Sequence, residues 1–273
     1  MRIIVTGGNS GVGRATASAM AAAGHEVVIA CRTLTKGQEA AAAMSGDVEV
    51  RELDLADLTS VRKFADTVDA VDVLVNNAGV LGLPLTRTLD GFEAHMGTNH
   101  LGHFALTCLL GDRIRDRVVA VASTNYTTAQ IHFDDLNWER RRYNPWAAYG
   151  ESKLANLLFV RGLVARGKTA FASDPGMTNT DITRDGSGAL QWAGRALSPY
   201  IAQKPADGAR STIQAISTTL PNGTYIAPRG LMHQWGKPKP TTLKDKAVDT
   251  DSARRLWELS AKLTGCEWQD GQP

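Results

Sequence analysis

The sequence is short of cysteine, of aromatic side chains and of net charge. Its 273 residues include 3 cysteines, an odd number without CxxC or Cys/His spacing, so neither a disulfide scaffold nor a zinc site is expected. We interpret Cys31, Cys108 and Cys266 as reduced thiols, each behaving as a small buried apolar residue. The 30 Lys and Arg residues against 28 Asp and Glu leave a net charge of +2, which gives no reason to expect a nucleic-acid partner.

Long apolar runs are missing as well. No stretch approaches the roughly 18 uncharged apolar residues that a membrane-spanning helix needs. The apolar run near the N-terminus is far shorter than the core of a signal peptide. We therefore expect no membrane span and a cytoplasmic protein. With 43% hydrophobic and 21% charged residues, the composition is that of an ordinary folded globule, and the length suits a single domain over residues 1–273.

Short apolar runs alternate with helix-like segments along much of the chain. The runs are Arg2–Thr6, Glu26–Cys31, Val48–Leu53, Val71–Val75, Arg117–Ala122 and Thr169–Ala172. Buried strands spaced by helices predict an α/β fold of Rossmann type, a doubly wound, mostly parallel sheet of seven strands with helices on both faces. We expect a substrate lid within about 177–205 and a C-terminal loop and helix over 221–265. Within the latter, the Pro/Gly-rich stretch Pro221–Pro240 predicts a long loop region.

A glycine-rich turn follows the first predicted strand and opens the first helix. It reads Thr6-Gly7-Gly8-Asn9-Ser10-Gly11-Val12-Gly13. Glycine lets the backbone turn tightly and approach a diphosphate, whose negative charge the helix N-terminus favours. This pattern predicts dinucleotide binding, and a tight turn without a ligand is the alternative. The residues assigned to the cofactor here are Gly7, Asn9, Ser10, Gly11, Val12 and Gly13.

The end of the second predicted strand bears on which dinucleotide binds. An acidic residue at that place holds the ribose 2′-hydroxyl of NAD, but this chain has Ala30-Cys31-Arg32-Thr33, without an acid. Arg32 can pair with a 2′-phosphate through a charge-assisted fork, with Asn9 and Ser10 within reach. We therefore predict NADP(H) over NAD(H). The alternative is a solvent-facing Arg32.

Tyr149 and Lys153 stand four residues apart in a segment with helical periodicity, so both side chains lie on one helix face. A tyrosine phenol titrates near about 10, and a nearby ammonium lowers that pKa. Tyr149 can then serve as general acid in carbonyl reduction or as general base in alcohol oxidation. The alternative is an exposed helix pair. His100 and His103 have no third ligand in view, so we predict no metal site.

These motifs occur in the order found in the short-chain dehydrogenase/reductase family, which the chain resembles in its single-domain form. The resemblance rests on the TGxxxGxG turn, on Asn76-Asn77-Ala78-Gly79 and on Tyr149-Gly150-Glu151-Ser152-Lys153. Longer segments such as Val28–Gly37 and Ala253–Gly265 resemble the retinol-dehydrogenase and protochlorophyllide-reductase-like branch. The likeness covers nearly the whole chain.

The resemblance implies functions for further residues. Ser123 would hydrogen-bond the substrate oxygen and stabilise developing negative charge, with Thr124 as the weaker candidate for this role. Asn99 would hold a water beside Lys153 and so connect a proton relay to solvent, while Lys153 would also hold the nicotinamide ribose. The remaining residues that it assigns to the cofactor are Asp54, Leu55, Asn76, Ala78, Gly79, Pro175, Gly176 and Thr178.

Five aromatic residues fall within Thr124–Ala148 and predict an aromatic wall: Tyr126, Phe133, Trp138, Tyr143 and Trp146. Such a wall favours an apolar or aromatic aldehyde, ketone or secondary alcohol. The function predicted is an NADP-dependent oxidoreductase that interconverts carbonyl and alcohol. The alternatives are an NADP-binding sensor on the same scaffold without turnover and a sugar-nucleotide epimerase or dehydratase. The resemblance allows a homodimer or homotetramer formed through the helices that carry Asn99 and Tyr149.

Overall fold

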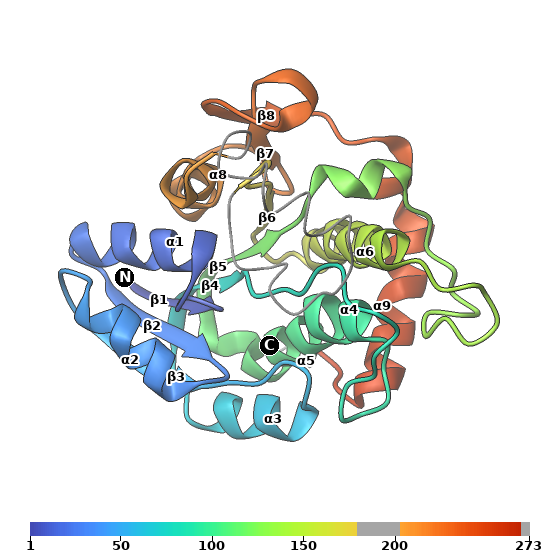
Figure 1. Cartoon of the computed structure of the whole chain (residues 1–273), viewed down its shortest axis with the longest axis horizontal. Helices are drawn as coiled ribbons and strands as arrows, with labels where there is room; N and C mark the ends of the chain where they lie inside the picture. Colours follow the sequence, from blue (N-terminus) through green and yellow to red (C-terminus); the bar gives the residue numbers. More distant parts are fainter. Residues whose placement is uncertain (179–202, 269–273) are drawn as a thin grey trace.

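The computed structural model describes residues 1–178 and 203–268. Within them lies an eight-stranded sheet of order β3-β2-β1-β4-β5-β6-β7-β8, a Rossmann-type arrangement (Figure 1). The first seven strands run parallel, and β8 pairs antiparallel with β7. The strands are β1 (Arg2–Thr6), β2 (Glu26–Cys31), β3 (Val48–Glu52), β4 (Val71–Asn76), β5 (Ile114–Val121), β6 (Ala170–Ser173), β7 (Tyr225–Pro228) and β8 (Pro238–Thr241).

Helices cover both faces of the sheet, so successive residues of its central strands are buried on opposite sides. Ile3 and Val5 of β1 join the core beneath α1, α2 and α8, whereas Ile4 joins the core beneath α3, α5 and α6. The longer helices are α1 (Gly11–Ala22), α2 (Leu34–Ala42), α3 (Leu58–Asp66), α5 (Gly102–Leu110), α6 (Pro145–Ala165), α8 (Pro205–Ser217) and α9 (Thr250–Thr264). The short ones are α4 (Ala94–Met96), η1 (Gly97–Leu101), η2 (Gly111–Arg113), η3 (Thr124–Thr128), η5 (Leu231–His233) and η6 (Asp245–Ala247).

The predicted count of seven strands was wrong, because the stretch expected to be a long loop contains β7 and the start of β8. All four residues of Tyr225–Pro228 are buried, so this short apolar run completes the parallel sheet. Its partner β8 lies at the edge of the sheet and contains Pro238 and Pro240. Proline donates no backbone hydrogen bond, and an edge strand tolerates it. The proline signal therefore marked an edge strand and not a loop.

The last helix, α9, packs across α5 and α6 (Figure 1). Trp257 stacks on Phe159 with ring centroids 5.7 Å apart and meets the edge of Phe104 at 5.0 Å. The His100 imidazole is also hydrogen-bonded to Ser260, with Nε2 and Oγ 2.9 Å apart. α9 therefore covers α5 and also α6, the helix of Tyr149, which is one of those through which the resemblance allows assembly.

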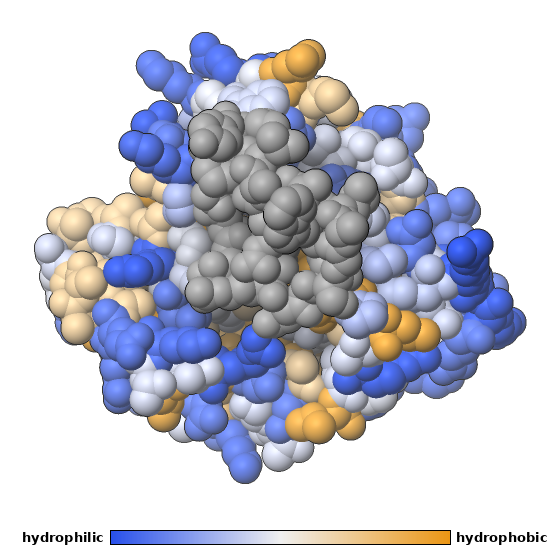
Figure 2. All heavy atoms as spheres, in the orientation of Figure 1, coloured by the Kyte–Doolittle hydropathy of each residue, from blue (hydrophilic) through white to orange (hydrophobic). Residues whose placement is uncertain are grey.

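The visible surface is mostly hydrophilic, with apolar residues scattered over it (Figure 2). The most exposed large apolar side chains are Leu89, Leu231 and Met232, at 81%, 79% and 70%. Among residues 1–178 and 203–268, no helix combines the length and the apolar character that crossing a membrane requires.

Candidate active site

The glycine turn between β1 and α1 has the tight geometry that its sequence predicts. Gly7 and Gly11 have φ values of +65° and +52°, where residues with a side chain are strained. At Gly13, an added Cβ would lie 2.4 Å from both the Gly7 carbonyl oxygen and the Asn77 amide nitrogen. Ser10 stands at the N-cap of α1 without a side-chain capping bond. Asn9 and Val12 lie in the same turn, with Val12 buried beneath it.

The segment after β4 is fastened to this turn by Thr6. The Thr6 hydroxyl accepts hydrogen bonds of 2.9 Å from the backbone N–H groups of Asn77 and Ala78. In return, the Asn77 side chain donates to the Thr6 carbonyl at 2.8 Å. The Asn76 side chain instead points into the core and donates to Thr107 at 3.0 Å. Asn76 thus stabilises the sheet against α5, while Ala78 and Gly79 lie beside the glycine turn.

Three further residues predicted to contact the cofactor follow β2 and β3. Arg32 is exposed and comes directly after β2, so it lies at the same sheet edge as the glycine turn. Asp54 and Leu55 follow β3; the Asp54 carboxylate accepts from the Ala56 N–H at 2.9 Å, and Leu55 is buried. All three therefore stand at the carboxyl ends of parallel strands, where ligands bind in open α/β sheets.

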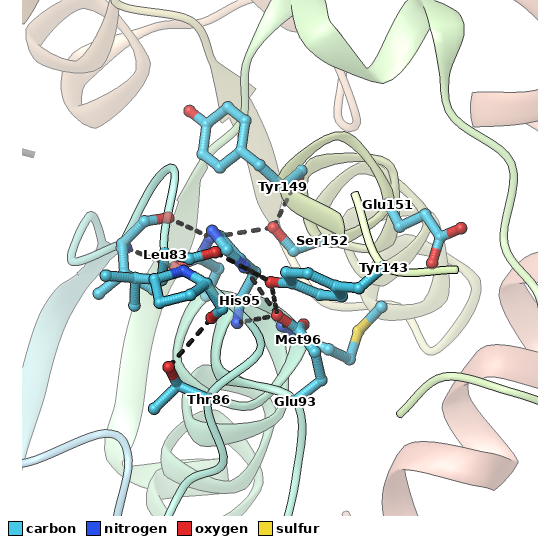
Figure 3. Close-up of polar contacts among 12 residues, drawn as sticks. Leu83, Thr86, Glu93, His95, Met96, Tyr143, Tyr149, Glu151 and Ser152 are labelled. Carbon is cyan, nitrogen blue, oxygen red and sulfur yellow. Dashed lines mark hydrogen bonds and ion pairs between the residues drawn. The ribbon is translucent and has the colours of Figure 1, made fainter. Parts of the chain in front are cut away.

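Asn99 lies in a π-helical turn, η1, which precedes α5. Its side chain accepts from the Val80 N–H at 2.8 Å, and its Nδ2 donates to the Val80 carbonyl at 3.1 Å and to the Ser152 hydroxyl at 2.9 Å. Ser152 in turn donates to the Tyr149 carbonyl at 2.7 Å (Figure 3). Asn99 therefore ties the segment after β4 to the helix that carries Tyr149. Single π-turns are common at functional sites.

Tyr149 and Lys153 both project from α6 into the buried centre of this sheet edge, and their side chains are close together. The Lys153 ammonium lies 5.6 Å from the Tyr149 ring centroid and donates to the Val121 carbonyl at 2.9 Å. A Cβ placed on Gly79 would lie 3.2 Å from Asn99 Oδ1 and 3.7 Å from Lys153 Nζ. Gly79, Asn99 and Lys153 therefore converge on one point.

Burial governs the protonation of this pair. It lowers the pKa of Lys153 to about 8. The negative charge of Asp174 acts in the opposite direction and raises this pKa. Burial also raises the pKa of Tyr149 above its usual value; a hydrogen bond with Ser123 lowers it, and the Asp174 charge raises it. The pKa of the phenol is therefore raised and not lowered as expected, so the phenol is protonated at neutral pH. A protonated phenol is the form that can donate a proton.

Ser123 stands at the end of β5, next to Tyr149, and its hydroxyl caps η3 by accepting from the Asn125 N–H at 3.4 Å. The turn after β6 lies along the same edge. Its Gly176 has a φ of +65°, and Thr178 donates to the Pro175 carbonyl at 2.8 Å. The sheet edge thus gathers Ser123, Tyr149 and this turn, as the sequence predicted.

The predicted lid, 177–205, lies largely outside the described residues. At its ends, Thr178 and Gln203 form an isolated parallel bridge, and the Gln203 side chain donates to the Pro175 carbonyl at 2.6 Å. Met177 N–H donates to the Gln234 carbonyl at 3.1 Å. Both ends of this segment therefore meet beside the turn after β6.

A buried polar network beside Tyr149 was not anticipated from the sequence. Glu93 Oε1 accepts from the His95 ring at 2.7 Å and from the Tyr143 hydroxyl at 2.9 Å, while Oε2 accepts from the Met96 N–H at 2.8 Å. Glu93 and His95 are fully buried, and the His95 and Tyr149 ring centroids are 6.3 Å apart, edge to face. Figure 3 shows Tyr149 above this network, with its hydroxyl pointing away from it. The network therefore packs against the Tyr149 ring through His95 and supports its position.

The five aromatic residues predicted as a wall pack in different places. Tyr126 meets the edge of Tyr225, Phe133 lies under the Arg255 guanidinium, and Trp146 is 49% exposed. Trp138 pairs with Tyr143 at 5.4 Å, and Tyr143 is the member that reaches the network beside Tyr149. Spacing along the chain did not distinguish these environments.

His103 connects the two halves of the site. Its Nδ1 lies 3.0 Å from the Asn99 carbonyl, which can only accept, so Nε2 accepts from the Thr6 hydroxyl at 2.8 Å. Burial lowers the pKa of His103 to about 4 and that of His100 to about 3, so both rings are neutral. Within the described residues, no group of three His, Cys, Asp or Glu side chains could hold a metal ion. The spacing of four between Asn99 and His103 was the available signal for this connection.

The comparisons with known proteins agree with this geometry. The family model described as short chain dehydrogenase matches residues 1–189, and the chain belongs to this family of oxidoreductases. It is 38% identical over 287 residues to retinol dehydrogenase 12 of Mus musculus, covering 98% of this chain and 87% of the relative.

Solved structures are similar over most of the fold. One, of an uncharacterised protein from Mycobacterium paratuberculosis, is 44% identical with a TM-score of 0.85, covering 98% of this chain and 94% of that one. Another, a short chain dehydrogenase from Burkholderia cenocepacia in complex with NADP, is 27% identical with a TM-score of 0.62, covering 82% and 94%.

Proposed function

We propose that the protein is an NADP(H)-dependent oxidoreductase that interconverts an apolar or aromatic carbonyl compound and its alcohol. The observation that carries the proposal is the convergence of Ser123, Tyr149, Lys153 and Asn99 at the carboxyl ends of the central strands, beside a glycine turn. Such a convergence of a hydroxyl, a phenol and an ammonium suits proton transfer to a substrate oxygen.

The residues present fit a nicotinamide dinucleotide. Gly7 and Gly13 pack so closely against Ala78 and Asn77 that a Cβ would clash there, and this tight turn leads into the N-terminus of a 12-residue helix, which favours a diphosphate. Gly7, Asn9, Ser10, Gly11, Val12 and Gly13 would hold its diphosphate end and Asp54, Leu55, Ala78 and Gly79 its adenosine side, while Asn76 supports the sheet beneath them. Pro175, Gly176 and Thr178 would hold the nicotinamide end. When bound, the cofactor supplies hydride chemistry.

Preference for NADP(H) rests on Arg32. Arg32 is exposed and comes directly after β2, at the sheet edge that also holds the turn with Asn9 and Ser10, where its guanidinium can pair with a 2′-phosphate. The NADP complex of the Burkholderia relative is in keeping with this choice.

The chain's own residues then divide the work. Tyr149, protonated because burial raises its pKa, gives its proton to the carbonyl oxygen during reduction. The Ser123 hydroxyl donates to the same oxygen and stabilises its developing charge. Lys153 would hold the nicotinamide ribose and support the tyrosine, and Asn99 maintains the position of α6 through its bond to Ser152. Asn99 would also connect the proton relay to solvent.

An apolar substrate is supported by the side chains near the turn after β6. Leu231 and Met232 are strongly exposed in η5, and Gln234, two residues on, binds Met177 of that turn. The matched relative is named a retinol dehydrogenase, and retinol is an apolar alcohol. The buried free state of Cys31, Cys108 and Cys266 supports the predicted cytoplasmic, reducing location.

The test is NADPH consumption against a panel of apolar and aromatic aldehydes and ketones, for the wild type, Tyr149→Phe and Tyr126→Phe. Removal of the Tyr149 hydroxyl should lower kcat by about 10²–10⁴-fold while NADPH binding, followed by fluorescence, persists. Tyr126 is a buried phenol outside the proposed machinery, and its variant should keep activity within a few fold. Wild-type protein that binds NADPH but reduces nothing would instead favour a sensor, and full activity in Tyr149→Phe would remove the assigned acid.

A further inference from the structure

A buried carboxylate lies at the end of β6, at a position to which neither the motifs nor the resemblance assigns a function. Asp174 is 1% exposed. Its Oδ2 accepts from the Tyr225 hydroxyl at 2.6 Å and from the Thr124 hydroxyl at 2.7 Å, and its Oδ1 accepts from the Gly176 N–H at 2.8 Å. All three partners are donors, the environment that a buried carboxylate requires.

These three bonds join separate parts of the site. Thr124 follows Ser123 at the end of β5, Gly176 belongs to the turn proposed to contact the nicotinamide end, and Tyr225 belongs to β7. The carboxylate therefore fixes the ends of three neighbouring strands relative to one another. A shift of this junction would move Ser123 and the turn together.

The same carboxylate acts on the catalytic pair through its charge. Burial lowers the pKa of Lys153 and Asp174 raises it, whereas for Tyr149 burial and Asp174 both raise the pKa. Other titratable groups also surround the pair. His103, from α5, is neutral because burial lowers its pKa to about 4, and the fully buried His95 is paired with Glu93.

We propose that Asp174 is a positioning residue for the reaction, which holds Ser123 and the turn at Gly176 in place and supplies the counter-charge of the Lys153 ammonium. This inference rests on the proposed function and deepens it. As a direct consequence, Tyr149 and Lys153 both stay protonated to higher pH than they would without the charge of Asp174.

The test compares Asp174→Asn with Tyr225→Phe. Asn keeps the shape of Asp174 but removes its charge, whereas Tyr225→Phe removes one hydrogen bond and keeps the charge. In carbonyl reduction, the basic limb of the kcat/KM profile should move to lower pH by about one unit or more in Asp174→Asn, because both pKa values fall. It should stay in place in Tyr225→Phe. A basic limb that is unmoved in Asp174→Asn, or equally moved in both variants, would overturn the proposal.

A second measurement does not need turnover. Titration of the Lys153 ammonium by NMR of ¹⁵N-labelled lysine should show a lower midpoint in folded Asp174→Asn than in the wild type. If the wild type reduces no carbonyl, the proposed function fails while this titration still tests Asp174. If Asp174→Asn does not fold, Asp174→Ser replaces it. Failure of both to fold beside a folded Tyr225→Phe would indicate a purely structural role and overturn the proposal.

Discussion

Replacement of Glu93 by Gln should destabilise the protein strongly, because the Glu93 carboxylate is the shared acceptor of a buried network. Oε1 accepts from the His95 N–H, the His95 ring and the Tyr143 hydroxyl, and Oε2 accepts from the Met96 N–H. In Glu93→Gln one oxygen becomes an NH₂ group, so at least one of these donors faces another donor. His95, whose Nε2 already has no hydrogen-bond partner, also loses the carboxylate that its Nδ1 contacts.

The magnitude follows from the burial of both partners. Removal of one member of a buried ion pair costs about 3–5 kcal/mol, and the lower end applies because Gln keeps the shape and one acceptor. We expect the free energy of unfolding to fall by about 3 kcal/mol, which lowers the Tm by about 6–12 °C. Tyr143→Phe removes one bond to a retained charge and should cost about 1.5 kcal/mol.

The assay is urea unfolding of wild type, Glu93→Gln, Tyr143→Phe and the double variant. The double variant should lose less stability than the two single variants together. Without the Tyr143 hydroxyl, one donor that would face the new NH₂ group is removed. Additive losses would show that the two side chains are not coupled. A loss below about 0.5 kcal/mol in Glu93→Gln, the range of neutral surface changes, would refute the argument.

Glu93→Gln should also change how the stability of the protein depends on pH. Burial raises the pKa of Glu93, but the bond and charge of His95 and the backbone N–H groups of Met96 and His95 outweigh it, so the net pKa in the folded protein is lowered. A lowered folded pKa contributes stability above the ordinary value of 4.5, which is lost as pH falls through the folded value. The stability gap between wild type and Glu93→Gln should therefore be constant near neutral pH and shrink below pH 4.5.

Three further outcomes test other parts of the molecule. Arg32→Ala should weaken NADPH binding by about tenfold or more, the effect of losing one charge-assisted bond, and leave NADH binding nearly unchanged in fluorescence titrations; equal effects on both would contradict the assignment. Gly13→Ala, whose Cβ would lie 2.4 Å from the Gly7 carbonyl oxygen, should distort the turn and abolish NADPH binding in the same assay, and retained affinity would refute the assignment of this turn to the cofactor. Because α9 covers α5 and α6, analytical ultracentrifugation should give the 29.3 kDa monomer, and a stable dimer would contradict this.

Patterns among neighbouring residues predicted two parts of the site, the glycine turn and the Tyr149–Lys153 pair. The turn around Gly7 and Gly13 needs residues without a side chain, and this need is visible in the sequence. The shared helix face of Tyr149 and Lys153 follows from a spacing of four. By contrast, β7 has four residues, too short to be distinguished from a loop by periodicity.

Contacts between distant segments could not be predicted in this way. Asp174 meets Thr124 and Tyr225 across 50 and 51 positions, and these contacts depend on the order of β5, β6 and β7 in the sheet. The protonation of Tyr149 depends on burial, which the motif does not specify. The sequence therefore placed Tyr149 and Lys153 on one helix face but predicted the wrong direction for the pKa shift of the phenol.

Asn99 is the point at which the cofactor half and the chemical half of the site meet. Through its carbonyl it binds His103, which binds Thr6 at the glycine turn; through its side chain it binds Ser152, which binds the Tyr149 backbone. Each connection is a buried hydrogen bond, and a buried polar group left unpaired costs about 1–3 kcal/mol. A displacement of either half would leave several such groups unpaired at once, so the polar core of the site holds its two halves in a fixed relative position.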